Sequence, residues 1–236
     1  MLRFSANLTL LFSELPFLDR FEAAAACGFS AVEILFPYDM AAQNLRTALR
    51  RNRLELVLIN APPPNYTGGE PGYAAIPGAE DRFRHDMRRV LRYAHLLKPG
   101  LIHVMAGYSD ASGEMDSFVD NLRWVADTAP LQRFTIEPLS PIAQPGYARS
   151  DYDVAVEVLE QVDRSDPDGM RSGLRQFGRV RQPLVDPIVL SQGHASCHRK
   201  QNNHQKLSHA GLLLRGRVER ESERSSLSCA FILVRL

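Results

Sequence analysis

The stretch RFTIEPLSP, residues 133–141, ends a β-type run with a single acid, Glu137, directly before a proline. Aromatic and β-branched residues such as those at 134–136 are typical of buried strands. An acid held inside a protein without a partner is costly in free energy. We therefore expect Glu137 to pair, to bind a metal or to transfer protons.

Four similar runs precede this one, and each is followed by a segment with helical spacing. The clearest helix has its apolar residues at three- and four-residue steps: Phe83, Met87, Val90, Leu91, Ala94 and Leu97. Strands are expected at residues 3–8, 31–36, 54–60, 101–107 and 133–139, and helices at about 16–27, 41–51, 83–97, 118–126 and from about 151. This alternation predicts parallel strands joined by crossover helices.

The length of each unit favours an α/β barrel. Five units within residues 1–165 give about 33 residues per unit, close to the roughly 31 of a (β/α)8 barrel. A doubly wound sheet is the competitor, but no G-x-G-x-x-G follows the first strand. The predicted fold is a partial (β/α)8 TIM barrel with about five recognisable βα units and an irregular C-terminal part.

The composition changes after Ser165. Residues 166–236 hold twelve Lys and Arg against six Asp and Glu, whereas residues 1–165 hold 16 against 21. We therefore separate a barrel domain, residues 1–165, from an atypical tail, residues 166–236, that we expect to be at most partly structured. Its His and Cys residues match no standard zinc spacing. Its arginines lack a basic helix or interleaved aromatics, so nucleic acid is not an expected partner.

Cysteine usage and the absence of long apolar runs bear on the compartment. The three cysteines form no C-x-x-C pair and leave one over, which fits a reducing compartment. The first residues lack the features of a signal peptide. No apolar run approaches the roughly 20 residues of a membrane span. A cytoplasmic protein without membrane contact is the expectation.

Each predicted strand carries one polar residue near its carboxyl end. Counting back from the strand ends puts these residues on one inward face: Asn7, Glu33, Asn60, His103 and Glu137. Active sites of barrels lie at that end, and the long loop 61–78 is expected to cover it. The alternative is structural, because a buried Asn or His more often bonds to backbone, and Glu33 could pair with an arginine.

Several motifs together resemble the hydroxypyruvate isomerase family, within the xylose-isomerase-like TIM barrels, over about residues 1–165. They are RFSANL (3–8), AVEILFPYD (31–39), LVLINAPP (56–63), IHVMAG (102–107), NLRW (121–124) and IEPLSP (136–141). The resemblance implies an isomerase that interconverts hydroxypyruvate and tartronate semialdehyde, or a similar 2-oxo acid pair, by enediol proton transfer. It implies no organic cofactor and a divalent ion such as Mg²⁺ or Mn²⁺.

The resemblance also implies roles for individual residues. Glu137 matches the glutamate of the family's I-E-P motif, a metal ligand and proton-transfer residue. His103 matches a histidine that contacts the substrate, a small 2-oxo or hydroxy acid. Asn7, Glu33 and Asn60 match pocket positions.

This sequence departs from the family's pattern at Gly178, where an aspartate of a Q-F-D-x-Y-H-like motif is expected. Three of the four implied metal ligands have no counterpart, so we hypothesise that the tail is read out of frame and that activity is impaired unless a partner chain completes the site. Open edges at the first and fifth strands favour pairing with a second copy, a homo-oligomer. The alternatives are another sugar isomerase or epimerase, an abasic-site nuclease of similar fold, or a non-catalytic binding module.

Overall fold

The computed structural model describes residues 4–64, 71–109, 111–139, 147 and 152–163. Its strands form one parallel sheet in the order β1-β2-β3-β4-β5. The strands are β1 (Ser5–Asn7), β2 (Ala31–Ile34), β3 (Glu55–Asn60), β4 (Leu101–His103) and β5 (Phe134–Thr135). Within the described residues, β1 and β5 therefore each have a single neighbour in the sheet.

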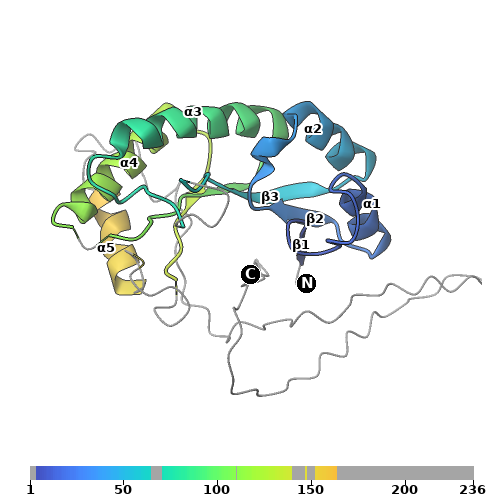
Figure 1. Ribbon diagram of the computed structural model, residues 1–236, viewed down its shortest axis with the longest axis horizontal. Coiled ribbons are helices and arrows are strands. Elements are labelled where there is room, and N and C mark those ends of the chain that lie inside the picture. Colours follow the sequence, from blue (N-terminus) through green and yellow to red (C-terminus); the bar gives the residue numbers. More distant parts are fainter. Residues whose placement is uncertain (1–3, 65–70, 110, 140–146, 148–151, 164–236) are drawn as a thin grey trace, which may run out of the picture.

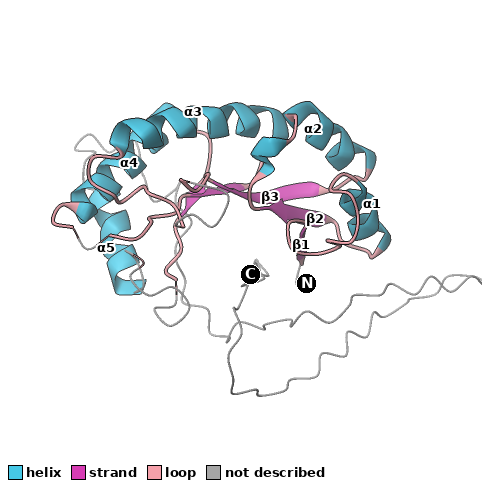
Figure 2. Cartoon of the chain, in the orientation of Figure 1, coloured by secondary structure: helices cyan, strands magenta, loops and turns pink. Residues whose placement is uncertain are grey.

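A helix follows each strand, and the helices form an arc along one face of the sheet (Figures 1 and 2). They are α1 (Asp19–Ala26), α2 (Ala42–Arg51), α3 (Glu80–Leu97), α4 (Glu114–Thr128) and α5 (Tyr152–Asp163), with a short 3-10 helix η1 (Pro37–Asp39) before α2. This arrangement confirms the predicted partial barrel with five βα units. None of the described helices is both long and apolar enough to cross a membrane.

The first helix begins three residues later than predicted. Residues 16–18 form a turn in which the Asp19 amide donates to the Pro16 carbonyl oxygen at 2.9 Å. The helix ends as predicted before Gly28, whose φ of +89° is a conformation that glycine adopts without a side-chain penalty.

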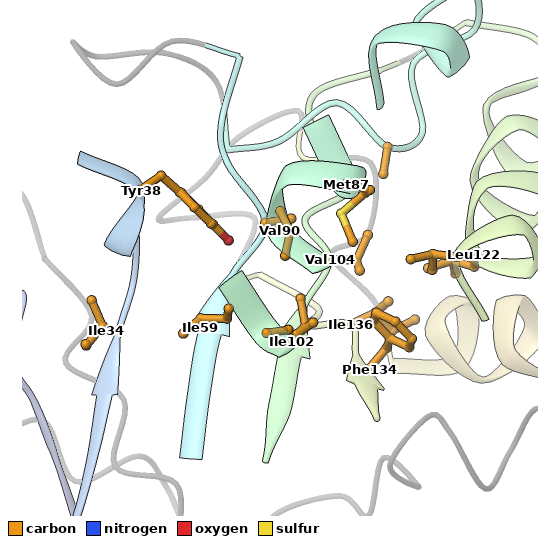
Figure 3. Close-up of a cluster of buried hydrophobic side chains, with 14 of the residues drawn as sticks. Ile34, Tyr38, Ile59, Met87, Val90, Ile102, Val104, Leu122, Phe134 and Ile136 are labelled. Atoms are coloured by element: carbon orange, nitrogen blue, oxygen red, sulfur yellow. The ribbon is translucent and has the colours of Figure 1, made fainter. Parts of the chain in front are cut away.

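The hydrophobic core lies between the sheet and the helices (Figure 3). Consecutive strands contribute Ile34, Ile59, Ile102 and Phe134, and α3 and α4 contribute Met87, Val90 and Leu122. All seven side chains are nearly or fully buried. One face of every strand is thus occupied by packing against helices, which leaves the opposite face for other side chains.

A β-bulge in β3 sets which residues reach that opposite face. Val32 pairs with Leu56, but the next residue of β2, Glu33, pairs with Leu58, so Val57 is an extra residue. Leu56 and Ile59 consequently both lie in the helix-side core although they are three positions apart. In a regular strand that kept Val57 without a bulge, strict alternation from Leu56 would turn Asn60 toward the helices.

Candidate active site

The structure brings the five polar residues singled out in the sequence to one edge of the sheet. Paired residues in a parallel sheet face the same side, and Asn7 pairs with Glu33 while Asn60 pairs with His103. Glu137 follows β5 by two residues, after Thr135, which pairs with His103. The site is therefore assembled from the carboxyl ends of five strands, and the roles of its residues stay predictions.

Several buried polar atoms at this edge have no hydrogen-bond partner. They are Ser5 Oγ, Asn7 Nδ2, Glu33 Oε1, Glu33 Oε2, Asn60 Oδ1 and His103 Nε2. Each of these side chains belongs to a residue at most 7% exposed. Folded proteins pair the large majority of buried polar groups, so such a concentration indicates a place where other molecules complete the hydrogen bonds.

The orientation of the Asn7 amide is fixed by its neighbours. The Thr9 amide donates to Asn7 Oδ1 at 3.0 Å, and the Thr9 hydroxyl in turn accepts from the Leu35 amide at 2.9 Å. Because the oxygen of Asn7 is occupied, its Nδ2 is the atom left as a donor to the site.

Arg20 of α1 holds the loop that follows β1. Its guanidinium donates to the carbonyl oxygens of Leu15 at 3.0 Å, Leu8 at 2.9 Å and Ser13 at 3.2 Å. Hydrogen bonds from a charged donor are stronger than neutral ones. This clamp fixes the backbone that carries Asn7 and Thr9.

Burial changes the acidity of the two carboxyl groups. It raises the pKa of Glu33 from 4.5 to about 7, and the nearby Asn7 amide opposes this shift although it lies outside hydrogen-bonding geometry. Burial also raises the pKa of Glu137 to about 7, with a further contribution from the charge of Glu33. Two carboxyl groups that are each half-ionised near neutral pH can both give and take a proton.

His103 lies beside this pair as a neutral imidazole. Its Nε2 is 3.9 Å from Glu137 Oε2, and burial lowers its pKa to about 4. The Glu137 side chain is 28% exposed, against 7% for His103. A ligand therefore reaches Glu137 from the outside with the neutral histidine next to it.

The loop after β3 is fixed against the end of β4. The amides of Ala74 and Ala75 donate to the carbonyl oxygens of Met105 and Ala106 at 3.3 and 2.8 Å. This close approach depends on Gly72 and Gly107, since a Cβ on Gly107 would lie 2.6 Å from the Gly72 carbonyl oxygen. The described part of this loop is thus a wall packed against the end of β4; that the loop covers the site stays a prediction, and residues 65–70 lie outside the described residues.

Three contributors to this framework were not predicted from the sequence. Thr9 and Tyr38 bond to the strand ends at Leu35 and Asn60, and the Tyr147 hydroxyl accepts a hydrogen bond from the Ala106 amide at 2.9 Å. The proline before Tyr38 was a usable signal, because it removes a backbone donor. Nothing in the local sequence indicated that Tyr147 returns to β4.

The described residues do not by themselves form a metal centre. Among them, no group of three or more His, Cys, Asp or Glu side chains is placed to hold an ion. The carboxylates of Glu33 and Glu137 offer anionic oxygens, but a tight divalent site needs several oxygen ligands at once. The His and Cys residues of the tail, and Gly178 where the family's pattern has an aspartate, lie outside the described residues.

Comparison with known proteins gives consistent matches. The chain is 42% identical over 168 residues to 2-oxo-tetronate isomerase of Cupriavidus necator and 38% identical over 168 residues to hydroxypyruvate isomerase of Escherichia coli. Each alignment covers 69% of this chain and 65% of the relative. The chain therefore spans less than two thirds of the length of these relatives.

A solved structure matches over the same part. The crystal structure of AP endonuclease, family 2 from Brucella melitensis is 39% identical, with a TM-score of 0.67, and the match covers 69% of this chain and 65% of that one. The family model described as xylose isomerase-like TIM barrel matches residues 21–167. Since the model covers more than half of the chain and the sheet has the parallel order of such a barrel, the chain belongs to the xylose isomerase-like TIM barrel family.

Proposed function

We propose that this protein is a sugar-acid isomerase that moves a proton between adjacent carbons of a small 2-oxo acid, such as hydroxypyruvate or 2-oxo-tetronate. The observation that carries the proposal is the pair of carboxyl groups, Glu33 and Glu137, with pKa values near 7 beside the neutral His103. The similarity to proteins named as isomerases of such acids supports the same assignment.

In the proposed reaction Glu137 acts as the base. Its ionised form removes a proton from the carbon that bears the substrate hydroxyl, and the electron pair forms the double bond of an enediol. The protonated Glu137 then returns the proton to the adjacent carbon, which was the carbonyl carbon. A pKa near 7 suits this role because both forms are populated at neutral pH.

The remaining polar atoms bind the two substrate oxygens. With its proton on Nε2, the neutral His103 can give that proton to the carbonyl oxygen, and the same nitrogen can then take up the hydroxyl proton. Asn7 offers a donor through Nδ2 and Asn60 an acceptor through Oδ1. These contacts would hold the two carbons next to Glu137.

We further propose that the described part of the site supports only slow turnover. A 2-oxo acid is an anion, and the site faces it with two acids and a histidine whose pKa is about 4. A divalent ion at Glu137 would need further ligands from outside the described residues. Groups that neutralise the substrate carboxylate must come from outside the described residues or from a partner chain.

Proton exchange tests the proposal more sensitively than product formation. The full chain is incubated with hydroxypyruvate in D2O, with and without Mg²⁺ or Mn²⁺, and loss of the carbon-bound proton signal is followed by NMR. We expect exchange above the buffer rate that falls to that rate in Glu137→Gln. The control is Glu157→Gln, which changes an exposed carboxylate of α5 and should leave exchange unaltered.

Two outcomes would count against these proposals. Equal exchange in wild type and Glu137→Gln would remove Glu137 as the proton carrier and favour a binding module. Turnover by the purified monomer at rates of about 10 s⁻¹, ordinary for enzymes, would show that the site is not impaired.

A further inference from the structure

Tyr38 lies where the hydrogen-bond ladder between β2 and β3 is interrupted. The Asn60 amide donates to the Leu35 carbonyl oxygen at 2.9 Å. In a regular parallel ladder the Asn60 carbonyl would next accept from the amide two residues after Leu35. That residue is Pro37, which has no N–H. The Tyr38 hydroxyl donates to the Asn60 carbonyl oxygen instead, at 2.5 Å.

Tyr38 is itself held firmly by α3. Arg89 donates to the Tyr38 carbonyl oxygen at 2.5 Å, and its guanidinium lies 5.6 Å from the centre of the Tyr38 ring. The Tyr93 ring meets the Tyr38 ring edge to face at 5.3 Å, and its hydroxyl donates to the Met40 carbonyl oxygen at 2.7 Å. Figure 3 shows the Tyr38 hydroxyl pointing from η1 toward the chain that leaves β3. These contacts fix the position of the Tyr38 hydroxyl independently of its bond to Asn60.

The Asn60 side chain has little else to orient it. Its Nδ2 lies 4.0 Å from the Met105 sulfur, a weak acceptor, and its buried Oδ1 has no donor. The direction of this amide is set mainly by the backbone of Asn60, where the strand leaves the ladder beside His103. A group that fixes that backbone also fixes where Oδ1 points in the site.

We propose that Tyr38 is a positioning residue of the isomerase site, whose hydroxyl replaces the amide missing at Pro37 and thereby holds Asn60 toward the substrate. The inference rests on the proposed function, since it assigns Asn60 to substrate binding. Tyr38 does not touch the substrate in this account, and its effect passes through Asn60. The consequence is that a residue of the helix-side core determines the geometry of a side chain on the opposite face of the sheet.

The first experiment measures amide hydrogen exchange in Tyr38→Phe and in Tyr93→Phe. Each variant removes one phenol hydroxyl from the same aromatic pair. Tyr93→Phe removes a partly buried hydroxyl that bonds to the Met40 and Tyr38 carbonyl oxygens, whereas only Tyr38→Phe removes the bond to Asn60. We expect the Asn60 and Ala61 amides to exchange at least about tenfold faster in Tyr38→Phe than in Tyr93→Phe. Equal protection of these two amides in both variants would overturn the proposal, whatever the protein catalyses.

The second experiment is a double-mutant cycle on the proton exchange of hydroxypyruvate in the full chain. If Tyr38 acts through Asn60, Tyr38→Phe lowers the exchange rate in the wild-type background but by less than about twofold in Asn60→Ala. If the two substitutions instead lowered the exchange rate by independent factors that multiply in the double variant, the proposed coupling between Tyr38 and Asn60 would be wrong. A wild type without Glu137-dependent exchange would reject the proposed function instead, and the amide measurement would still decide the role of Tyr38.

Discussion

Glu33 and Glu137 lie close enough on the inner face of the sheet for the charge of Glu33 to raise the pKa of Glu137. The two carboxyl groups come from strands that are three places apart in the sheet. Only a curved sheet brings such residues together, because neighbouring strands are about 4.8 Å apart. The interaction is thus a direct consequence of barrel curvature.

The buried carboxyl of Glu33 should make stability depend on pH. Its pKa is about 7 in the folded chain and 4.5 in the reference state, so between these values the folded chain binds more protons and loses stability as pH rises. Glu33→Gln removes this loss, and its advantage over wild type should grow from pH 4 to pH 8 by about 3 kcal/mol. Urea unfolding across this range measures it.

The matched control is Glu157→Gln, which changes an exposed carboxylate of α5. A Glu33→Gln advantage that shrinks with rising pH would contradict the assignment. His103 acts in the opposite direction between about pH 4 and 6.5 in both proteins, since its folded pKa is lowered, and it therefore cancels in the comparison.

His103 should remain neutral in mildly acidic solution. Burial lowers its pKa to about 4, so its ring signals should keep their neutral-form chemical shifts at pH 5.5. Nitrogen-15 NMR of the imidazoles measures this, and His103→Gln identifies the signal by its loss. A midpoint above pH 6 for that signal would show that the ring is open to water or paired with an ionised Glu137.

The contact between Gly72 and Gly107 should be intolerant of a methyl group. Gly107→Ala places a Cβ 2.6 Å from the Gly72 carbonyl oxygen and forces a side chain into φ +96°. Gly113→Ala is the control, because its φ is +91° but nothing lies within 4 Å of the added Cβ. The control should cost about 1 kcal/mol and Gly107→Ala about 2 kcal/mol more, by thermal unfolding. Equal losses would mean that the wall is not closely packed.

Removing the guanidinium of Arg20 should loosen the loop after β1. Arg20→Met leaves the carbonyl oxygens of Leu8, Ser13 and Leu15 without their donor and should cost roughly 2 kcal/mol. Arg50→Met, at an exposed position of α2, should change stability by less than about 0.5 kcal/mol. The Leu10 and Leu11 amides both donate to the backbone carbonyl oxygen of Asn7, and their hydrogen-exchange rates should rise only in Arg20→Met.

The sequence predicted the elements well where apolar spacing was regular. The spacing from Phe83 to Leu97 gave α3, and the single polar residue near each strand end gave the five residues that meet at the site. The pattern carries this information because one face of every element must pack against another layer. Residues 1–165 and 166–236 as separate domains remain a prediction, since the second range lies outside the described residues.

The spacing of apolar residues could not predict the contacts that support the site. Tyr38, Arg89 and Tyr93 join segments that are about 50 residues apart in the chain, and such contacts exist only once the sheet has formed. The three-residue error at the start of α1 has a local cause, because Pro16 is compatible with both a turn and a first helical turn.

The extra residue at Val57 has a consequence for how this chain can change. Leu56, before the extra residue, and Ile59, after it, both pack against the helices, while Asn60 faces the site. Deleting Val57 would leave a regular ladder in which Glu33 still pairs with Leu58 and Ile34 with Ile59, so Asn60 would keep its face. The sheet can therefore lose this one residue without turning Asn60 away from the other polar residues of the site.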